Sequence, residues 1–309
     1  MSNEQENFKP LSFDDDENFK PLSFDDDNKK IEDFVPISDP KINSNEIISK
    51  DSNFVFFFGI AGTGKSVILS AMLYYFRTKG GVLRTKPGSP NSKEAQVLLA
   101  DFFENISKGI LPSRTTRDEV TRMDFVFEPN NKSKKVPPIN LTFLETAGQN
   151  HQEITRGGKY HSKIDVYLNA NVPLNIIIVT SYDTAHKDDS LINEFFGDLE
   201  RRGYSLKALD VLLVVSKWDM SGRTDVSTEE ELENFVQQRL PMTNNVINSY
   251  ELSKTYFTIG NIEKTANSEK ITLLNLSSAE IISKWLYETI VGYPLDYEGT
   301  FWERIKFSF

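Results

Sequence analysis

Continuous apolar runs alternate with segments of helical periodicity along most of the chain. The runs at 54–58, 176–179 and 211–215 contain no polar residue, which is typical of strands buried on both faces of a parallel sheet. Between and after these runs, apolar side chains recur at helical spacing at 67–78, 92–110, 190–202, 228–240 and 277–291. This order of strands and helices predicts a doubly wound α/β sheet.

A pair of strands with a different pattern is predicted in the first half of the chain. At 122–127 apolar and polar side chains alternate, as in an antiparallel strand with one covered face. A second strand, 139–144, follows after the basic, proline-ended link 131–138. We therefore expect a mostly parallel sheet with one antiparallel edge strand.

The first apolar run leads directly into a glycine-rich segment that ends in Lys-Ser. It has the pattern G-x-x-x-x-G-K-S, a phosphate-binding loop. The glycines allow backbone N–H groups to turn inward toward phosphate oxygens. Lys65 reaches the β and γ phosphates, and Ser66 offers its hydroxyl to Mg²⁺ at the start of the next helix. The predicted contacts are Gly59, Gly62, Thr63, Gly64, Lys65 and Ser66.

The alternative is a glycine-rich turn that ends in Lys-Ser by chance. A buried strand before the segment and a helix after it are the context that a phosphate-binding loop requires. The neighbouring pattern therefore favours the phosphate-binding interpretation.

Acidic charge is concentrated in the first 52 residues. They contain 14 Asp and Glu against 6 Lys, a net charge of −8, whereas the remaining 257 residues contain 31 acids and 29 bases, a net charge of −2. The sequence ENFKPLSFDDD occurs at 6–16 and again at 17–27, and 32–38 keeps the shared pattern E-x-F-x-P-[L/I]-S. Few apolar residues and a proline in each unit predict a disordered tail.

Two interpretations of the repeats remain open. One is a multivalent motif that binds a protein partner through Phe and Leu or Ile. The other is replication slippage in a solubilising tail. The third copy keeps the apolar anchors and the proline but loses the acidic run, which favours partner binding.

Composition excludes several classes of protein. The absence of cysteine excludes disulfides, thiolate zinc sites, prenylation and palmitoylation, and Ser2 is incompatible with myristoylation. The three histidines have no metal-ligand spacing. Without a long apolar run or a signal peptide we expect a cytoplasmic protein with no lipid anchor. The balanced charge beyond the tail predicts no nucleic-acid binding.

A second motif, E-T-A-G-Q, follows the predicted strand at 139–144. With the phosphate loop it resembles Ras-like, translation-factor-class P-loop GTPases, which often have D-T-A-G-Q, and the long inserts suggest a less studied bacterial branch. The resemblance implies that Glu145 holds Mg²⁺ through water and that the Gly148 N–H contacts the γ phosphate. It also implies that Gln149 orients the attacking water. Glutamate in place of aspartate leaves the hydrolysis rate open.

The resemblance extends to the residues that recognise the base. The segment S-K-W-D, which resembles N-K-x-D, follows the apolar run at 211–215. Asp219 then accepts hydrogen bonds from the guanine edge, the stem of Lys217 packs over the base, and Ser216 replaces the usual Asn, which leaves guanine preference open. Such a tetrapeptide alone is more often a surface turn, but its place two strands after the second motif favours base recognition. Gly260 occupies a short loop that contacts the base in the family.

A threonine that binds Mg²⁺ and the γ phosphate is expected between the first helix and the paired strands. Thr115 and Thr116 both qualify, and Thr116 is preferred. Arg114 is a candidate arginine finger, with a solvated loop arginine as the alternative. A helical insert near 80–110 lies beside this switch region. His151 and the glycine pair at 157–158 follow the second motif, and they indicate either a hinge or an ordinary loop.

The predicted organisation is a disordered tail at 1–52, a GTPase domain at 53–293 and an aromatic segment at 294–309. We expect this segment to pack back on the domain, with a partner or membrane surface as the alternative. The predicted function is hydrolysis of Mg²⁺-bound GTP to GDP and phosphate by a molecular switch that is slow without an activator. We expect the tail and the insert to bind a protein partner. The alternatives are a nucleotide-binding scaffold with little turnover and an ATPase or kinase of the wider P-loop class. The oligomeric state is left open.

Overall fold

The computed structural model describes most of the chain after residue 50. Its described residues are 51–89, 92–112, 120–146, 148, 151, 160, 162–170, 172–221, 229–264 and 269–298. The repeats of the tail and the end of the aromatic segment lie outside these ranges. Their predicted disorder, partner binding and packing therefore stay predictions.

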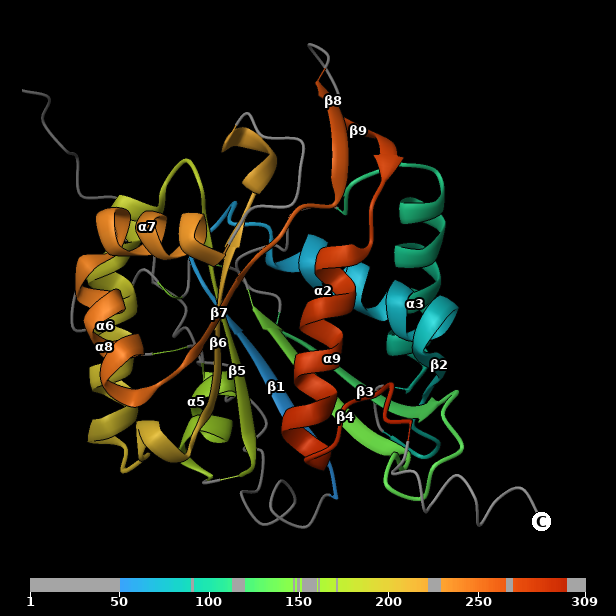
Figure 1. Cartoon of the computed structure of the whole chain (residues 1–309). Coiled ribbons are helices and arrows are strands. Elements are labelled where there is room, and N and C mark those ends of the chain that lie inside the picture. The colour runs from blue at the N-terminus through green and yellow to red at the C-terminus, as the bar shows by residue number, and fades with distance from the viewer. Residues whose placement is uncertain are drawn as a thin grey trace, which may run out of the picture. The chain divides into compact units, whose positions relative to one another are not determined.

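A seven-stranded sheet lies at the centre of the described region (Figure 1), with strand order β2-β3-β4-β1-β5-β6-β7. β1 pairs in parallel with β4 and β5, and β5, β6 and β7 continue in parallel. Only β3 runs against its two neighbours. The strands are β1 (Asn53–Phe58), β2 (Gly81–Thr85), β3 (Val120–Pro129), β4 (Ile139–Thr146), β5 (Leu174–Ser181), β6 (Asp210–Ser216) and β7 (Ser253–Tyr256).

The predicted mostly parallel, doubly wound sheet is confirmed. Its antiparallel strand β3 lies one position in from the edge, because β2 pairs with the outer side of β3. The strand β2 was not predicted, because its five residues GVLRT carry only two apolar side chains. The polar residues of β3 that face one side are consistent with its place near the edge of the sheet.

Helices cover both faces of the sheet. The predicted helices at 67–78, 92–110, 190–202 and 277–291 are present, and the first of them ends in a π-helical turn, Phe76–Gly80. The helices are α2 (Lys65–Tyr75), α3 (Ser92–Ser107), α5 (Ser162–Asn169), α6 (Ala185–Arg201), α7 (Glu229–Arg239), α8 (Pro241–Tyr250) and α9 (Ser277–Val291). None of the described helices is long and apolar enough to cross a bilayer.

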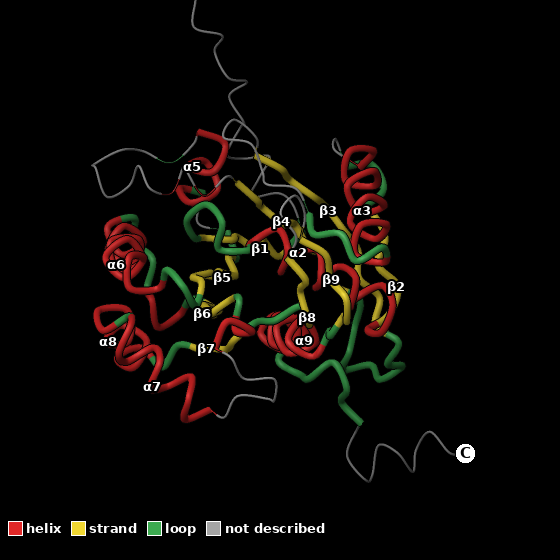
Figure 2. The backbone as a smooth tube through the Cα atoms, turned by 90° about the horizontal axis from the view of Figure 1, so that it is seen from above, coloured by secondary structure: helices red, strands yellow, loops and turns green. Residues whose placement is uncertain are grey.

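The side chains of β1 alternate between two hydrophobic cores. Val55 and Phe57 belong to the core formed with α2, α3 and α9. Phe54, Phe56 and Phe58 belong to the core formed with α5, α6, α7 and α8. Figure 2 shows α6 and α8 on one side of the sheet and α9 on the other. β1 is therefore buried on both faces, which explains why its run has no polar residue.

The predicted helix at 228–240 corresponds to α7, and a second helix, α8, follows it directly. Pro241 stands in the first turn of α8, where a missing N–H costs nothing. Beyond β7 the chain forms an antiparallel hairpin of β8 (Gly260–Lys264) and β9 (Glu269–Leu274). The short helix α5 and this hairpin were also not predicted.

Candidate nucleotide-binding site

The glycine-rich segment forms a tight loop between β1 and α2. Gly59, Gly62 and Gly64 all have positive φ angles, of 150°, 84° and 87°. A Cβ on Gly59 would lie only 2.2 Å from the carbonyl oxygen of Val179 in β5. Conformation and close approach therefore both require glycine at the entrance of the loop.

Lys65 folds back over the loop that precedes it. Its Nζ donates hydrogen bonds to the carbonyl oxygens of Gly59, at 2.7 Å, and Ile60, at 3.0 Å. Burial lowers the pKa of Lys65 to about 8, and the carboxylates of Glu145 and Asp188 oppose this shift. An ammonium group has three N–H donors. Lys65 can therefore keep both backbone contacts and still donate to a phosphate oxygen.

Ser66 and Glu145 meet at the start of α2. The Ser66 hydroxyl donates a hydrogen bond to Oε1 of Glu145, which is buried at the end of β4. Among the described residues no group of three or more His, Asp or Glu side chains is placed to hold a metal ion. Mg²⁺ is commonly bound by one or two carboxylates together with substrate phosphates. The hydroxyl and the carboxylate therefore fit a magnesium site that a nucleotide would complete.

Gly148, three residues after Glu145, lies against the loop. It packs so closely that a Cβ on it would lie 2.1 Å from the carbonyl carbon of Ile60 and 2.2 Å from the nitrogen of Ala61. Any larger residue at 148 would displace the loop. The predicted γ-phosphate contact of Gly148 stays a prediction, but the structure places this glycine directly beside the phosphate loop.

His151 is buried under the entrance of the loop, a position that the sequence did not predict. Its Nδ1 lies 3.0 Å from the backbone nitrogen of Gly59, and its ring stacks on Phe58 at a centroid distance of 4.7 Å. Burial, followed by the charge of Lys65, lowers the pKa of His151 to about 3. The ring is therefore neutral at physiological pH.

Asp188 was also missed. It is buried in the first turn of α6, where Thr180 donates a hydrogen bond to its carboxylate at 2.7 Å. Burial raises the pKa of Asp188. The negative charge of Asp188 acts to raise the pKa of Lys65. In the sequence it looks like an ordinary acidic residue at a helix start, and no local signal distinguishes it.

The S-K-W-D segment lies against the other end of the loop. The buried Ser216 hydroxyl donates a hydrogen bond to the carbonyl oxygen of Thr63 at 2.5 Å. Lys217 has a φ angle of 53°, and its Nζ contacts the carboxylate of Asp183 at 3.3 Å. Asp219 is exposed. The structure therefore brings Ser216, the first residue of the predicted base-recognition segment, into contact with the predicted phosphate loop. The roles of Lys217 and Asp219 at a base stay predictions.

Gly260 begins β8 and has a structural reason to be glycine. Its φ angle is 115°, and a Cβ would lie 1.9 Å from the carbonyl oxygen of Leu273. The residues before it approach the S-K-W-D segment, since the backbone N–H of Trp218 donates to the carbonyl oxygen of Phe257 at 3.2 Å. The hairpin thus accounts for the glycine, and its contact with a base stays a prediction.

Three predicted site residues lie outside the described residues. They are the switch threonine Thr116 with its neighbour Arg114, and Gln149 of the second motif. The helix α3 of the insert ends at Ser107, a few residues before this switch region. The roles of all three residues stay predictions.

The fold and the loop define a P-loop protein of the doubly wound α/β class. The sequence matches no protein-family model and no curated protein. Among solved structures it is similar to Methanosarcina barkeri Roco2 RocCORdC bound to GDP, with a TM-score of 0.36 and 13% identity over 84% of this chain. The chain spans 55% of the length of that structure.

A second similar structure is the signal recognition particle receptor SRb-GTP/SRX complex from Chaetomium thermophilum. The TM-score is 0.39 and the identity 14%, over 77% of this chain and 99% of that chain. Both structures are only distantly similar to this chain. The functional assignment is therefore based on the residues of the site.

Proposed function

We propose that this chain binds GTP and GDP with Mg²⁺, hydrolyses GTP slowly and works as a nucleotide-dependent switch in the cytoplasm. One observation carries the proposal: Lys65 is already bonded to the Gly59 and Ile60 carbonyls of a loop with three glycines in left-handed conformations. Such a loop presents backbone N–H groups and a fixed cation to a polyphosphate. Bound Mg²⁺ would neutralise charge between the β and γ phosphates.

The preference for guanine is assigned to Asp219. It follows β6 in a short turn, Trp218–Ser221, and is exposed, three residues after Ser216, which contacts the phosphate loop. Guanine presents two N–H donors on its Watson–Crick edge, which a carboxylate accepts and adenine does not supply. Lys217 contributes its aliphatic stem above the base, with Asp183 holding its ammonium group.

Hydrolysis requires groups that act on the transferred phosphoryl group. We assign Lys65 to stabilising its charge and Gln149 to orienting the attacking water, with Thr116 as a further ligand of Mg²⁺ and Arg114 as a positive charge in cis. The tail repeats and the insert with α3 are the proposed contacts for a protein partner. Release of the γ phosphate would change the loops that such a partner recognises.

A second candidate is a nucleotide-holding scaffold with little turnover. The direct hydrogen bond between Ser66 and Glu145 favours it. Glutamate is one methylene longer than the aspartate usual in the family, so it reaches the hydroxyl itself. An acid held in this way is less free to order water around a metal ion, and slower hydrolysis follows.

The test is a titration of the full chain with fluorescent GDP, GTP and ATP analogues in Mg²⁺, followed by phosphate release. Trp218 is the buried tryptophan of the S-K-W-D segment and reports binding by energy transfer. Guanine binding with turnover supports the switch, and guanine binding without turnover supports the scaffold. Preference for ATP overturns the assignment of Asp219, and no binding of any nucleotide overturns the proposal. A Lys65→Met variant, which loses the cation, is the negative control.

A further inference from the structure

His151 occupies an aromatic pocket beneath the phosphate loop. It is fully buried, with Phe58 stacked on the ring and Phe56 edge-on at a centroid distance of 5.6 Å. Phe58 in turn stacks on Phe195 of α6 at 3.8 Å. A polar ring in such surroundings is costly unless it forms a hydrogen bond. A phenylalanine would fill the pocket at lower cost, so the ring nitrogens need an explanation.

The direction of the His151 hydrogen bond depends on the tautomer of the ring, which we assign from the neighbouring groups. Nδ1 lies 3.0 Å from the nitrogen and 2.9 Å from the oxygen of Gly59, and a single ring nitrogen serves only one of them. The Gly59 carbonyl already accepts from Lys65, whereas its buried N–H needs an acceptor. Nδ1 is therefore the acceptor and the proton resides on Nε2, which has no hydrogen-bond partner in the described part of the chain.

Gly59 is thus held from both sides. Its N–H donates to His151, and its carbonyl accepts from the ammonium group of Lys65. We propose that His151 is a positioning residue of the phosphate loop, which orients Gly59 so that Lys65 is held ready for a phosphate. The inference rests on the proposed function. It adds a residue that lies outside the motifs from which that function was predicted.

Two other residues of the same stretch also contact the loop. Gly148 packs on the backbone of Ile60, and Glu145 accepts a hydrogen bond from Ser66. With His151 at the entrance, these three residues contact the loop at its beginning, its middle and its end. The contact of His151 therefore adds a third, separate point of support for the loop.

Three variants separate the hydrogen bond from packing. Asparagine places its amide oxygen where Nδ1 lies, glutamine places its amide near the position of Nε2, and phenylalanine fills the pocket without an acceptor. We expect H151N to bind GTP as the parent does, within about twofold. H151Q and H151F should bind about tenfold more weakly, the effect of one buried hydrogen bond. His186→Asn, on the exposed surface of α6, is the matched control and should change nothing.

Two measurements without nucleotide test the same contact. With selective ¹⁵N-glycine labelling, the Gly59 amide should exchange slowly in the parent and in H151N, and faster in H151Q and H151F. The imidazole ¹⁵N shifts of the parent should show the Nε2–H tautomer. Normal GTP binding and a protected Gly59 amide in H151F would overturn the proposal, as would an Nδ1–H tautomer. If the parent binds no nucleotide, the proposed function fails, while amide exchange and the tautomer still decide the role of His151.

Discussion

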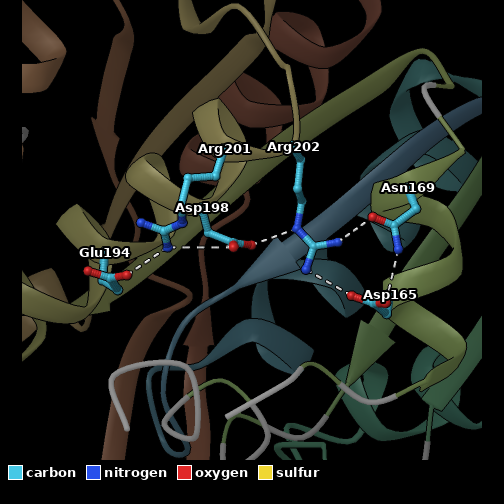
Figure 3. Close-up of polar contacts among 6 residues, drawn as sticks. All are labelled: Asp165, Asn169, Glu194, Asp198, Arg201 and Arg202. Atoms are coloured by element: carbon cyan, nitrogen blue, oxygen red, sulfur yellow. Dashed lines mark hydrogen bonds and ion pairs between the residues drawn. The ribbon is translucent and has the colours of Figure 1, made fainter. Parts of the chain in front are cut away.

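Arg202, just after the end of α6, donates a hydrogen bond to Asp165 of α5 at 2.8 Å. The same guanidinium donates to Asp198 at 2.7 Å and to Asn169 at 2.6 Å (Figure 3), and it lies over the ring of Tyr160. All three of its nitrogens are used. Arg202 therefore fastens α5, the helix after the second motif, to the helix that packs under β1.

Replacing Arg202 with lysine should destabilise the fold, because an ammonium group cannot reproduce this planar fork. We expect a loss of about 1–3 kcal/mol in the free energy of unfolding, measured by urea denaturation. Arg201 is the matched control: it is exposed and pairs with Glu194 on its own helix. R201K should leave the midpoint unchanged, and equal effects of the two variants would contradict the assigned role of Arg202.

Ser216 should support the phosphate loop without reading the base. Its only proton is donated to Thr63, so it has none left for N7 of a purine. We expect Ser216→Ala to weaken binding of GTP and of 7-deaza-GTP by the same factor, about three- to tenfold. Competition titrations with the two nucleotides measure this. A variant that loses affinity for GTP alone would show that Ser216 contacts N7.

Asp219→Asn should shift nucleotide preference from guanine toward xanthine. The amide donates where the carboxylate accepted, which matches the extra carbonyl of xanthine. We expect GTP affinity to fall at least about a hundredfold and XTP affinity to rise. Asp210 lies at the opposite end of β6, and D210N is the control that should keep the parental preference. An unchanged preference in D219N would remove Asp219 from the base site.

Acid should destabilise the protein through His151. Its pKa is about 3 in the folded state and about 6.5 when unfolded. Between these values the unfolded chain binds more protons than the folded protein. The contribution of His151 to the free energy of unfolding is therefore fully present above pH 6.5 and is lost as the pH falls toward 3. Urea denaturation across this range should show a loss of a few kcal/mol that H151F lacks. H186N should keep the parental pH dependence, and a parallel loss in H151F would assign the effect to other groups.

Asp189 should stabilise the start of α8. Its two carboxylate oxygens accept the backbone N–H groups of Thr243, at 2.8 Å, and Met242, at 3.0 Å. Removing the carboxylate in D189A leaves these donors without their acceptor and should cost about 2 kcal/mol in urea denaturation. Asp189→Asn keeps one acceptor oxygen and should lose less. If both variants are as stable as the parent, water replaces the cap.

Local patterns were sufficient for the elements that contain their own signal. The apolar runs of β1, β5 and β6 need burial on both faces wherever they lie, and the periodicity of 277–291 reproduces the bounds of α9. The phosphate loop was predicted because strand, turn and helix residues follow one another within a few positions. The E-T-A-G-Q and S-K-W-D motifs were recognised from their order along the chain, although Glu145 and Ser216 differ from the residues usual at those positions.

The contacts between distant segments were decided by packing in three dimensions. His151 contacts Gly59, 92 positions away in the sequence, and Ser216 contacts Thr63, 153 positions away. Nothing in the local sequence around either residue indicates its partner. The strand β2 exists because β3 offers an unpaired edge, and α8 is capped by Asp189 of α6 rather than by a residue of its own. Hydrogen-bond partners far apart in the chain are selected by the shape of the folded sheet, which local sequence does not encode.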